Sequence, residues 1–330
     1  MAPHPQKLAV TRRSWPLARP VMTAQGLRTT ADVVVADISD GDSRGRAEGV
    51  PVMRFGESIE SVFAALEAMK GAVLGGLNRE TLQQALPPGA ARNALDCALW
   101  DIDAKRAYQA ASELAGFGVM TPVVTAFTLA FDTPENMAEQ AAANRVRPLF
   151  KLELGDGDDL ERVQAVRSAV PASRLIVDAN ESWTEATLAE WMHALMDCRV
   201  EMIEQPLPAD ADDALGRLAH QIPICADESC RTRADLDRLD GKYQAVNIKL
   251  DKAGGLTEAL ALATEAKRRG LRIMAGGMIG TSLGIAPALI LAQRADIVDL
   301  GGPLLLASDR VPGLRYDGST IHPPEASFWG

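Results

Sequence analysis

Three carboxylates and one lysine are spaced regularly along the second half of the chain. Each of them ends a short apolar segment: Asp178, Glu204, Asp227 and Lys249. The gaps between consecutive members are 26, 23 and 22 residues. A gap of this size fits one strand, one loop and one helix, so a parallel barrel would gather all four side chains at one rim. Three acids beside a lysine indicate a divalent metal ion next to a base.

The chemistry of such a rim follows from its residue types. Hard cations such as Mg²⁺ prefer carboxylate oxygens and keep positions open for substrate. We therefore predict that Asp178, Glu204 and Asp227 bind Mg²⁺, which would stabilise the negative charge that develops when a proton leaves the carbon α to a carboxylate. Lys249 is the predicted base, because a nearby cation and partial burial would lower its pKa.

A second pair of charged residues precedes Asp178. Lys151 and Glu153 alternate on one segment, so in a strand they point the same way and would face Lys249 across the metal. Either residue could also be a simple rim charge. A lysine at a barrel strand end can form a Schiff base instead. The three carboxylates argue against that reaction, because they would hold an unmetallated lysine protonated.

The elements that must position these residues repeat about every 25 residues from Pro122 onward, as expected of strand–helix units. Eight apolar segments are predicted strands: 123–129, 148–154, 174–179, 200–206, 222–228, 244–250, 271–277 and 296–302. Helical stretches lie between them, one of them preceded by a capping-box pattern at Ser182 and Glu185. An open doubly wound sheet would also alternate in this way, but the chain lacks its glycine-rich phosphate loop. The pattern favours a closed barrel.

The first third of the chain has a different pattern. Residues 6–48 read as strands and turns, with a turn at Asp40-Gly41-Asp42, and residues 58–110 show helical periodicity. Together they predict an α+β module. We expect three regions: a capping domain over 1–118, a barrel with the metal site over 119–308, and a segment over 309–330 that returns to the cap.

Composition argues against several classes of partner. The 330 residues carry a formal net charge of −10, which disfavours nucleic acid and anionic membranes. No segment is apolar for long enough to act as a signal peptide or a membrane span, and the four cysteines lack the spacing of a zinc site. We expect a cytoplasmic protein that acts on a small molecule.

Five motifs resemble the enolase superfamily, in its muconate-lactonizing-like branch, and most closely the dipeptide epimerases: KLELG, IVDANESW, MIEQPLP, ICADES and VNIKLDKAGGL. The segments GRAEGVPVMRFGES, GAARNALDCALWDIDAKRA and VDLGGPLLL extend the resemblance over nearly the whole chain. It implies a Mg²⁺-dependent (β/α)₇β barrel capped by an N-terminal α+β domain. It also implies an isomerase of the L-Ala-D/L-Glu type, and a homo-oligomer.

The resemblance assigns roles residue by residue and also shows departures. It implies that Asp178, Glu204 and Asp227 are metal ligands, that Lys249 is one acid/base catalyst, and that Glu228 supports the ligands. The family's other catalyst is the second lysine of a K-x-K motif, which reads Lys151-Leu152-Glu153 here. The family's Asp-x-Asp pair, which holds the ammonium group of a dipeptide, reads Asp299-Leu300-Gly301. Ala24-Gln25-Gly26 stands where an arginine is often found.

These departures leave three hypotheses for function. The first is a dipeptide epimerase in which Lys249 works with Glu153 or Lys151. The second is a one-base lyase or cycloisomerase of the same superfamily, like o-succinylbenzoate synthase or a dehydratase, and the third is a non-catalytic metal-binding paralogue. We expect specificity to lie in the loops over 24–30 and 52–58. Four rim residues are expected beside the substrate: Thr128, Met278, Ile279 and Asp299.

Overall fold

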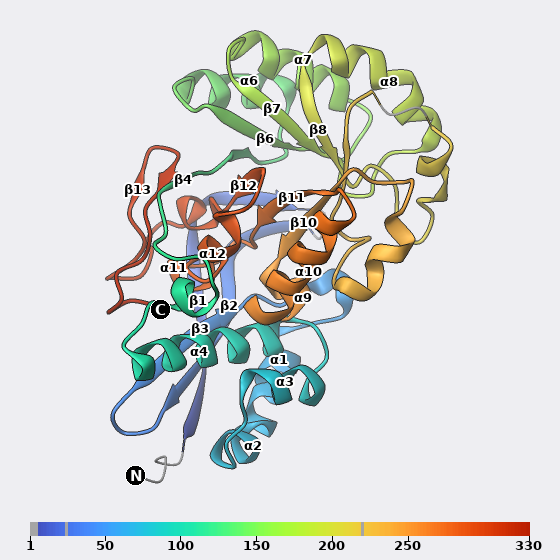
Figure 1. The fold of residues 1–330 in the computed structure, drawn as a ribbon. Helices are drawn as coiled ribbons and strands as arrows, with labels where there is room; N and C mark the ends of the chain where they lie inside the picture. Colours follow the sequence, from blue (N-terminus) through green and yellow to red (C-terminus); the bar gives the residue numbers. More distant parts are fainter. Residues whose placement is uncertain (1–5, 24–25, 219–220) are drawn as a thin grey trace.

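The computed structural model describes residues 6–23, 26–218 and 221–330, so Ala24 and Gln25 of the predicted specificity loop lie outside the described residues. Figure 1 shows a cap, coloured blue to teal, against a barrel coloured green to red. The predicted capped (β/α)₇β barrel is confirmed. Among the described residues, every helix is too short or too polar to cross a lipid bilayer.

The cap is a three-stranded antiparallel sheet with helices beside it. Its strands are β1 (Lys7–Thr23), β2 (Gly26–Ser39) and β3 (Arg44–Gly49). Its helices are η1 (Met53–Phe55), α1 (Ile59–Ala68), α2 (Lys70–Leu74), α3 (Arg79–Ala85), α4 (Ala90–Ala107) and α5 (Ala111–Leu114). The predicted turn between β2 and β3 is present, with Gly41 in the left-handed region at φ 96°.

Helix α4 lies at the centre of the cap, and 13 of its 18 residues are buried. Strand β3 approaches it through two glycines. A Cβ atom at Gly45 would clash with the backbone of Ala98, and one at Gly49 would clash with the backbone of Ala90. Only glycine therefore allows this sheet to lie directly on α4.

The barrel has eight parallel strands in sequential order. They are β5 (Phe127–Leu129), β6 (Leu149–Glu153), β7 (Arg174–Asp178), β8 (Val200–Glu204), β9 (Ile224–Ala226), β10 (Ala245–Lys249), β11 (Arg272–Gly276) and β12 (Ile297–Asp299). The first and last strands approach each other where Ala126 N donates to Val298 O at 2.8 Å. Every predicted strand segment contains an observed one, although segment 123–129 is divided. Its first part, β4 (Val123–Val124), pairs with β14 (Thr320–Ile321), which also pairs with β13 (Tyr316–Asp317).

Helices alternate with the barrel strands. The α-helices are α6 (Pro134–Ala143), α7 (Asp159–Ala169), α8 (Glu185–Asp197), α9 (Leu250–Ala253), α10 (Leu256–Arg268), α11 (Ser282–Ile285) and α12 (Ala288–Ala292). After β8 and β9 the chain forms the short 3₁₀ helices η2 (Asp213–Gly216) and η3 (Arg233–Leu239), and η4 (Gly302–Leu305) follows β12. The predicted capping box before α8 is wrong. Thr184 caps that helix by accepting a hydrogen bond from Thr187 N at 3.1 Å, whereas Ser182 Oγ donates to Ala179 O.

Buried polar contacts join the cap to the barrel and to the last part of the chain. Glu48 of β3 accepts hydrogen bonds from Thr281 N at 2.7 Å and from an Arg310 guanidinium nitrogen at 2.7 Å. At the end of the chain, Gly330 N donates to Asp101 Oδ1 of α4 at 2.7 Å. These contacts hold the cap against the barrel and bring the end of the chain against α4.

Asp251 lies buried at the same junction, and its burial should make stability depend on pH. Its Oδ1 accepts hydrogen bonds from Val50 N at 2.9 Å and Asn93 Nδ2 at 2.7 Å, and burial raises its pKa to about 7. Between about pH 4 and 7 the folded state therefore binds more protons than the unfolded state, so the free energy of unfolding falls as pH rises. Asp251→Asn keeps the acceptor but cannot ionise. We expect the substitution to reduce the decrease in the free energy of unfolding between about pH 4 and 7 by at least about 1 kcal/mol, since one pKa unit corresponds to about 1.4 kcal/mol. Urea titrations at several pH values measure this decrease.

The matched control for Asp251 is Asp317→Asn, which removes an exposed carboxylate from β13. The control should keep the pH dependence of the unaltered protein. An identical dependence in the Asp251→Asn protein would show that Asp251 does not carry a raised pKa in the folded state.

Candidate active site

Two layers of side chains fill the barrel interior. The lower layer is an apolar cluster. It takes one residue from each of the strands β6 to β12, together with Ala126, which directly precedes β5: Ala126, Leu149, Ile176, Met202, Cys225, Ala245, Met274 and Ile297. Strand side chains repeat every two residues, so the next inward position lies two residues further on. These positions form the upper layer: Thr128, Lys151, Asp178, Glu204, Asp227, Asn247, Gly276 and Asp299. The spacing seen in the sequence thus becomes one polar layer at the carboxyl ends of the strands.

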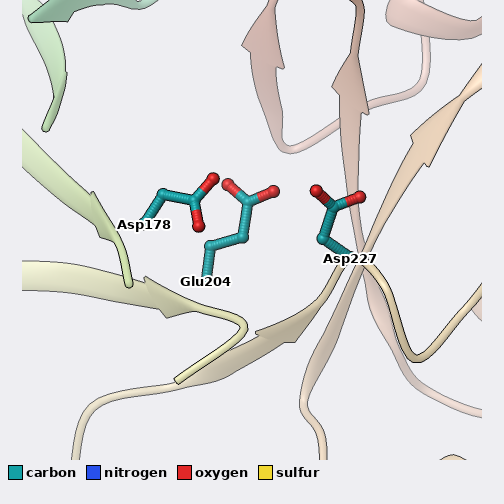
Figure 2. A group of neighbouring side chains, drawn as sticks. All are labelled: Asp178, Glu204 and Asp227. Carbon is teal, nitrogen blue, oxygen red and sulfur yellow. The ribbon is translucent and has the colours of Figure 1, made fainter. Parts of the chain in front are cut away.

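The three predicted carboxylate ligands converge within this layer. Asp178, Glu204 and Asp227 are buried, and each offers an oxygen within 4.8 Å of the others. Figure 2 shows their carboxyl groups directed toward one another, with Glu204 between the two aspartates. Three buried oxygen donors at this separation suit a hard divalent cation, because such an ion offsets the cost of gathering negative charge.

The pKa values of the three carboxyl groups reflect their surroundings. Burial raises the pKa of Asp178 to about 6 and that of Glu204 to about 7. Burial also acts on Asp227, but the ammonium groups of Lys249 and Lys252 hold its pKa well below the usual value. A cation between these groups would favour the ionised form of all three.

Lys249 and Lys151 lie at different ends of the carboxylate row. Lys249 Nζ donates to Asp227 Oδ2 at 2.6 Å. Lys151 Nζ lies 2.8 Å from Asp178 Oδ2 and 3.0 Å from Glu204 Oε2. Burial acts to lower the pKa of both lysines, but the surrounding carboxylates outweigh burial and raise it. The two predicted proton-transfer positions are therefore on opposite sides of the row.

Glu153 lies two residues after Lys151, at the carboxyl end of β6. Its Oε1 is 3.4 Å from Lys151 Nζ, and its Oε2 accepts a hydrogen bond from Asn180 Nδ2 at 2.8 Å. Both side chains line the cavity, and Glu153 is the more exposed of the two, at 25% against 3% for Lys151. Asn180 adopts φ 49°, a left-handed conformation that asparagine tolerates better than most residues.

Asp299 completes the upper layer from the last strand. Its Oδ1 accepts a hydrogen bond from Thr128 Oγ1 at 3.1 Å, and its Oδ2 lies 3.3 Å from Lys151 Nζ. Gly301 follows and offers no side chain; a Cβ atom there would lie 3.3 Å from Ala126 O. Asp299 is thus a carboxylate that already has two partners.

A cavity of about 190 Å³ opens above the polar layer, between barrel and cap. The predicted residues Thr128, Met278, Ile279, Asp299 and Glu228 all line it. Burial and the adjacent Asp227 and Asp178 raise the pKa of Glu228 well above its usual value, as expected for a group against the carboxylate row.

Cap residues close the mouth of this cavity. The segment from Val50 to Phe55 lines it and includes the first four residues of the predicted loop over 52–58. Arg54 of this segment forms a bidentate ion pair with Glu181, at 2.6 and 3.0 Å. Arg28 also lines the cavity, and one of its guanidinium nitrogens lies 3.3 Å from Met53 Sδ.

Sequence reasoning missed several polar residues at the site. Asn247 Nδ2 donates to Glu204 Oε1, and its position two residues before Lys249 was a usable signal because both face inward. Lys252 Nζ donates to the side chain and backbone oxygens of Asp227, but it lies beyond the strand, where alternation no longer applies.

Two family models together span most of the chain. The mandelate racemase/muconate lactonizing enzyme N-terminal domain matches residues 6–116, and the enolase C-terminal domain-like model matches residues 136–324. The L-Ala-D/L-Glu epimerase of Escherichia coli K12 is 46% identical over 95% of this chain and 98% of its own length. The N-acetyl-D-glutamate racemase of a Pseudoalteromonas species is 43% identical over 90% of this chain and 95% of its own.

Solved structures agree with these matches. An enolase family member from Agrobacterium tumefaciens with homology to dipeptide epimerases, with bound sodium and L-Ala-L-Glu, is 48% identical with a TM-score of 0.97, over 99% of this chain and all of that one. The dipeptide epimerase of Enterococcus faecalis V583, complexed with Mg and L-Leu-L-Tyr, is 28% identical with a TM-score of 0.90, over 97% of this chain and 98% of that one. The chain therefore belongs to the mandelate racemase and muconate-lactonizing branch of the enolase superfamily.

Proposed function

We propose that the protein is a Mg²⁺-dependent dipeptide epimerase of the L-Ala-D/L-Glu type. Its main support is the row of three carboxylates with one lysine at each end, because reversible inversion needs a proton-transfer group on each face of the α carbon. The curated relatives described above are named as an epimerase and a racemase. These names favour an isomerase over a lyase or a non-catalytic paralogue.

Asp178, Glu204 and Asp227 would hold the ion. Bound Mg²⁺ supplies electrostatic stabilisation for the negative charge on the substrate carboxylate while the α proton is absent. Glu228 lies against the ligands, and Asn247 orients Glu204. Lys249 removes or returns the proton on one face.

The Lys151–Glu153 pair serves the other face. Both side chains line the cavity, and ion pairs with Glu153 and Asp178 hold Lys151 in place. Thr128, Met278 and Asp299 lie beside the substrate, and Arg28 at the cavity mouth suits a substrate with a second, side-chain carboxylate.

A second candidate is racemisation of N-acylated amino acids. The observation that favours it is the state of Asp299, whose two oxygens already face Thr128 and Lys151, while Gly301 supplies no further carboxylate. A free ammonium group would have to compete for Asp299, whereas an acylated nitrogen carries no charge and needs no carboxylate. The relative named N-acetyl-D-glutamate racemase agrees with this candidate.

Exchange of the α hydrogen in D₂O tests both candidates. L-Ala-L-Glu and N-acetyl-L-glutamate are incubated with the protein and Mg²⁺, and deuterium content and configuration are measured. Exchange with inversion of the dipeptide supports the first candidate, and inversion of N-acetylglutamate alone supports the second. Absence of exchange with both substrates would contradict both.

Glu153→Gln tests the second face in the same assay. We expect it to slow inversion by about 100-fold, within the range of general acid–base catalysis, while exchange through Lys249 continues with retention. The matched control is Glu201→Gln, which changes a half-buried glutamate that pairs with Arg174 on the outside of β8. Unchanged inversion in the Glu153→Gln protein would remove Glu153 from the mechanism.

A further inference from the structure

Gln205 follows Glu204 at the end of β8 and connects the segments that carry all three carboxylates. It is fully buried and adopts φ 34°, in the left-handed region. Its backbone N donates to Cys225 O of β9 at 2.9 Å, and its backbone O accepts from Glu181 N at 2.8 Å, in the segment after β7. The residue therefore contacts both neighbours of its own strand.

The Gln205 side chain adds a direct connection to the third carboxylate residue. Its Oε1 accepts hydrogen bonds from Asp227 N at 2.9 Å and Ser229 N at 3.2 Å. Its Nε2 donates to Leu207 O at 2.9 Å, Ser229 Oγ at 2.9 Å and Tyr243 Oη at 3.1 Å. The amide thus holds the backbone of Asp227 without touching its carboxylate.

The orientation of this amide is fixed by its surroundings. Ser229 Oγ and Tyr243 Oη each donate to Asp212 Oδ2 at 2.7 Å. Each hydroxyl has one proton and gives it to Asp212, so each hydroxyl oxygen can only accept a hydrogen bond from Gln205. The NH₂ group of Gln205 must therefore point toward these two oxygens. The amide oxygen is then left for the backbone N–H groups of Asp227 and Ser229. A flipped amide would place donors against donors.

From this geometry we infer that Gln205 is a positioning residue that sets the affinity of the metal site by fixing Asp227 relative to Asp178 and Glu204. The inference rests on the proposed metal-binding function. Residues that orient metal ligands without touching the ion typically change affinity by about 10- to 100-fold when substituted. Gln205 acts on a ligand through its backbone, so we expect an effect in this range.

Calorimetric titration with Mg²⁺ alone tests the inference, with the unfolding temperature of each protein measured in parallel. Gln205→Met keeps the side-chain length but makes none of these hydrogen bonds, and we expect the Mg²⁺ dissociation constant to rise about 10- to 100-fold. Gln205→Asn is the milder variant and should act in the same direction, because its shorter amide cannot reach Asp227 N. If the Gln205→Met protein does not fold, the Mg²⁺ dissociation constant of the Gln205→Asn protein tests the inference.

Gln83→Met is the matched control. Gln83 belongs to α3 of the cap, away from the metal site, and its side chain donates hydrogen bonds to Arg79 O and Asp96 Oδ1. It should lower the unfolding temperature without changing the dissociation constant. A folded Gln205 variant with unchanged Mg²⁺ affinity would overturn the positioning role while leaving the metal site intact. An unaltered protein that binds no Mg²⁺ would overturn the metal site, and the role of Gln205 with it.

Discussion

Lys249→Met should reduce the rate of α-hydrogen exchange by about 1,000-fold or more in the substrate epimer whose α hydrogen faces Lys249, within the range expected when a general base is lost. The substitution keeps the length of the side chain and removes only the ammonium group, which lies 2.6 Å from Asp227 Oδ2. Asp227 retains its contact with Lys252, so we expect the carboxylate row to keep its arrangement. The measurement is deuterium incorporation into the substrate in D₂O with saturating Mg²⁺.

Two controls separate loss of the base from loss of the site. Lys267→Met removes an exposed lysine at the end of α10 and should leave the exchange rate unchanged. Calorimetry on the Lys249→Met protein should still detect Mg²⁺ binding. Exchange within tenfold of the unaltered rate would assign the base to another residue.

Glu204→Gln should weaken Mg²⁺ binding by more than about 100-fold, the upper end of the effect of residues that merely orient ligands. Glu204 is the central carboxylate of the row, and the amide cannot supply a charged oxygen to the ion (Figure 2). Without Mg²⁺ the change should cost little stability, because burial already raises the pKa of Glu204 to about 7. Titration calorimetry measures the affinity, and exchange in D₂O should fall with it.

The control for this substitution lies on the same strand. Glu201→Gln makes the same chemical change at a half-buried, outward-facing position of β8 and removes an ion pair with Arg174. It should preserve both Mg²⁺ affinity and exchange. Equal Mg²⁺ affinity in the Glu204→Gln and unaltered proteins would exclude Glu204 as a ligand.

The candidate site was predictable from the sequence because parallel strands reduce a three-dimensional arrangement to a linear spacing. Asp178, Glu204 and Asp227 each lie two residues beyond an apolar residue of the lower barrel layer, and both periodicities were visible in the chain. Asn247 obeyed the same rule. The sequence did not single it out, because an uncharged amide between two apolar residues does not by itself indicate a metal site or a proton-transfer group.

Features that depend on the docking of two separated regions were not predictable. Arg28 lies in the predicted specificity loop over 24–30, but no local pattern singles it out from that loop, because its approach to the cavity depends on how the cap packs over the barrel. The capping-box prediction at Ser182 failed because two later threonines offered a competing cap, and Thr184 Oγ1 accepts from Thr187 N instead. Similarly, Val123 and Val124 have the composition of a barrel strand but pair with β14, a partner almost 200 residues away in the chain.

The contact between Glu48 and Arg310 has a consequence for the order in which the protein assembles during translation. These partners are separated by 262 residues, so at roughly 5–20 residues per second a ribosome needs about 13–52 s to make Arg310 after Glu48. For that time the nascent cap carries a carboxylate whose native cation has not yet been synthesised. The contact between Glu48 and Arg310 can therefore form only after the last part of the chain has been made, later than the contact between Glu48 and Thr281.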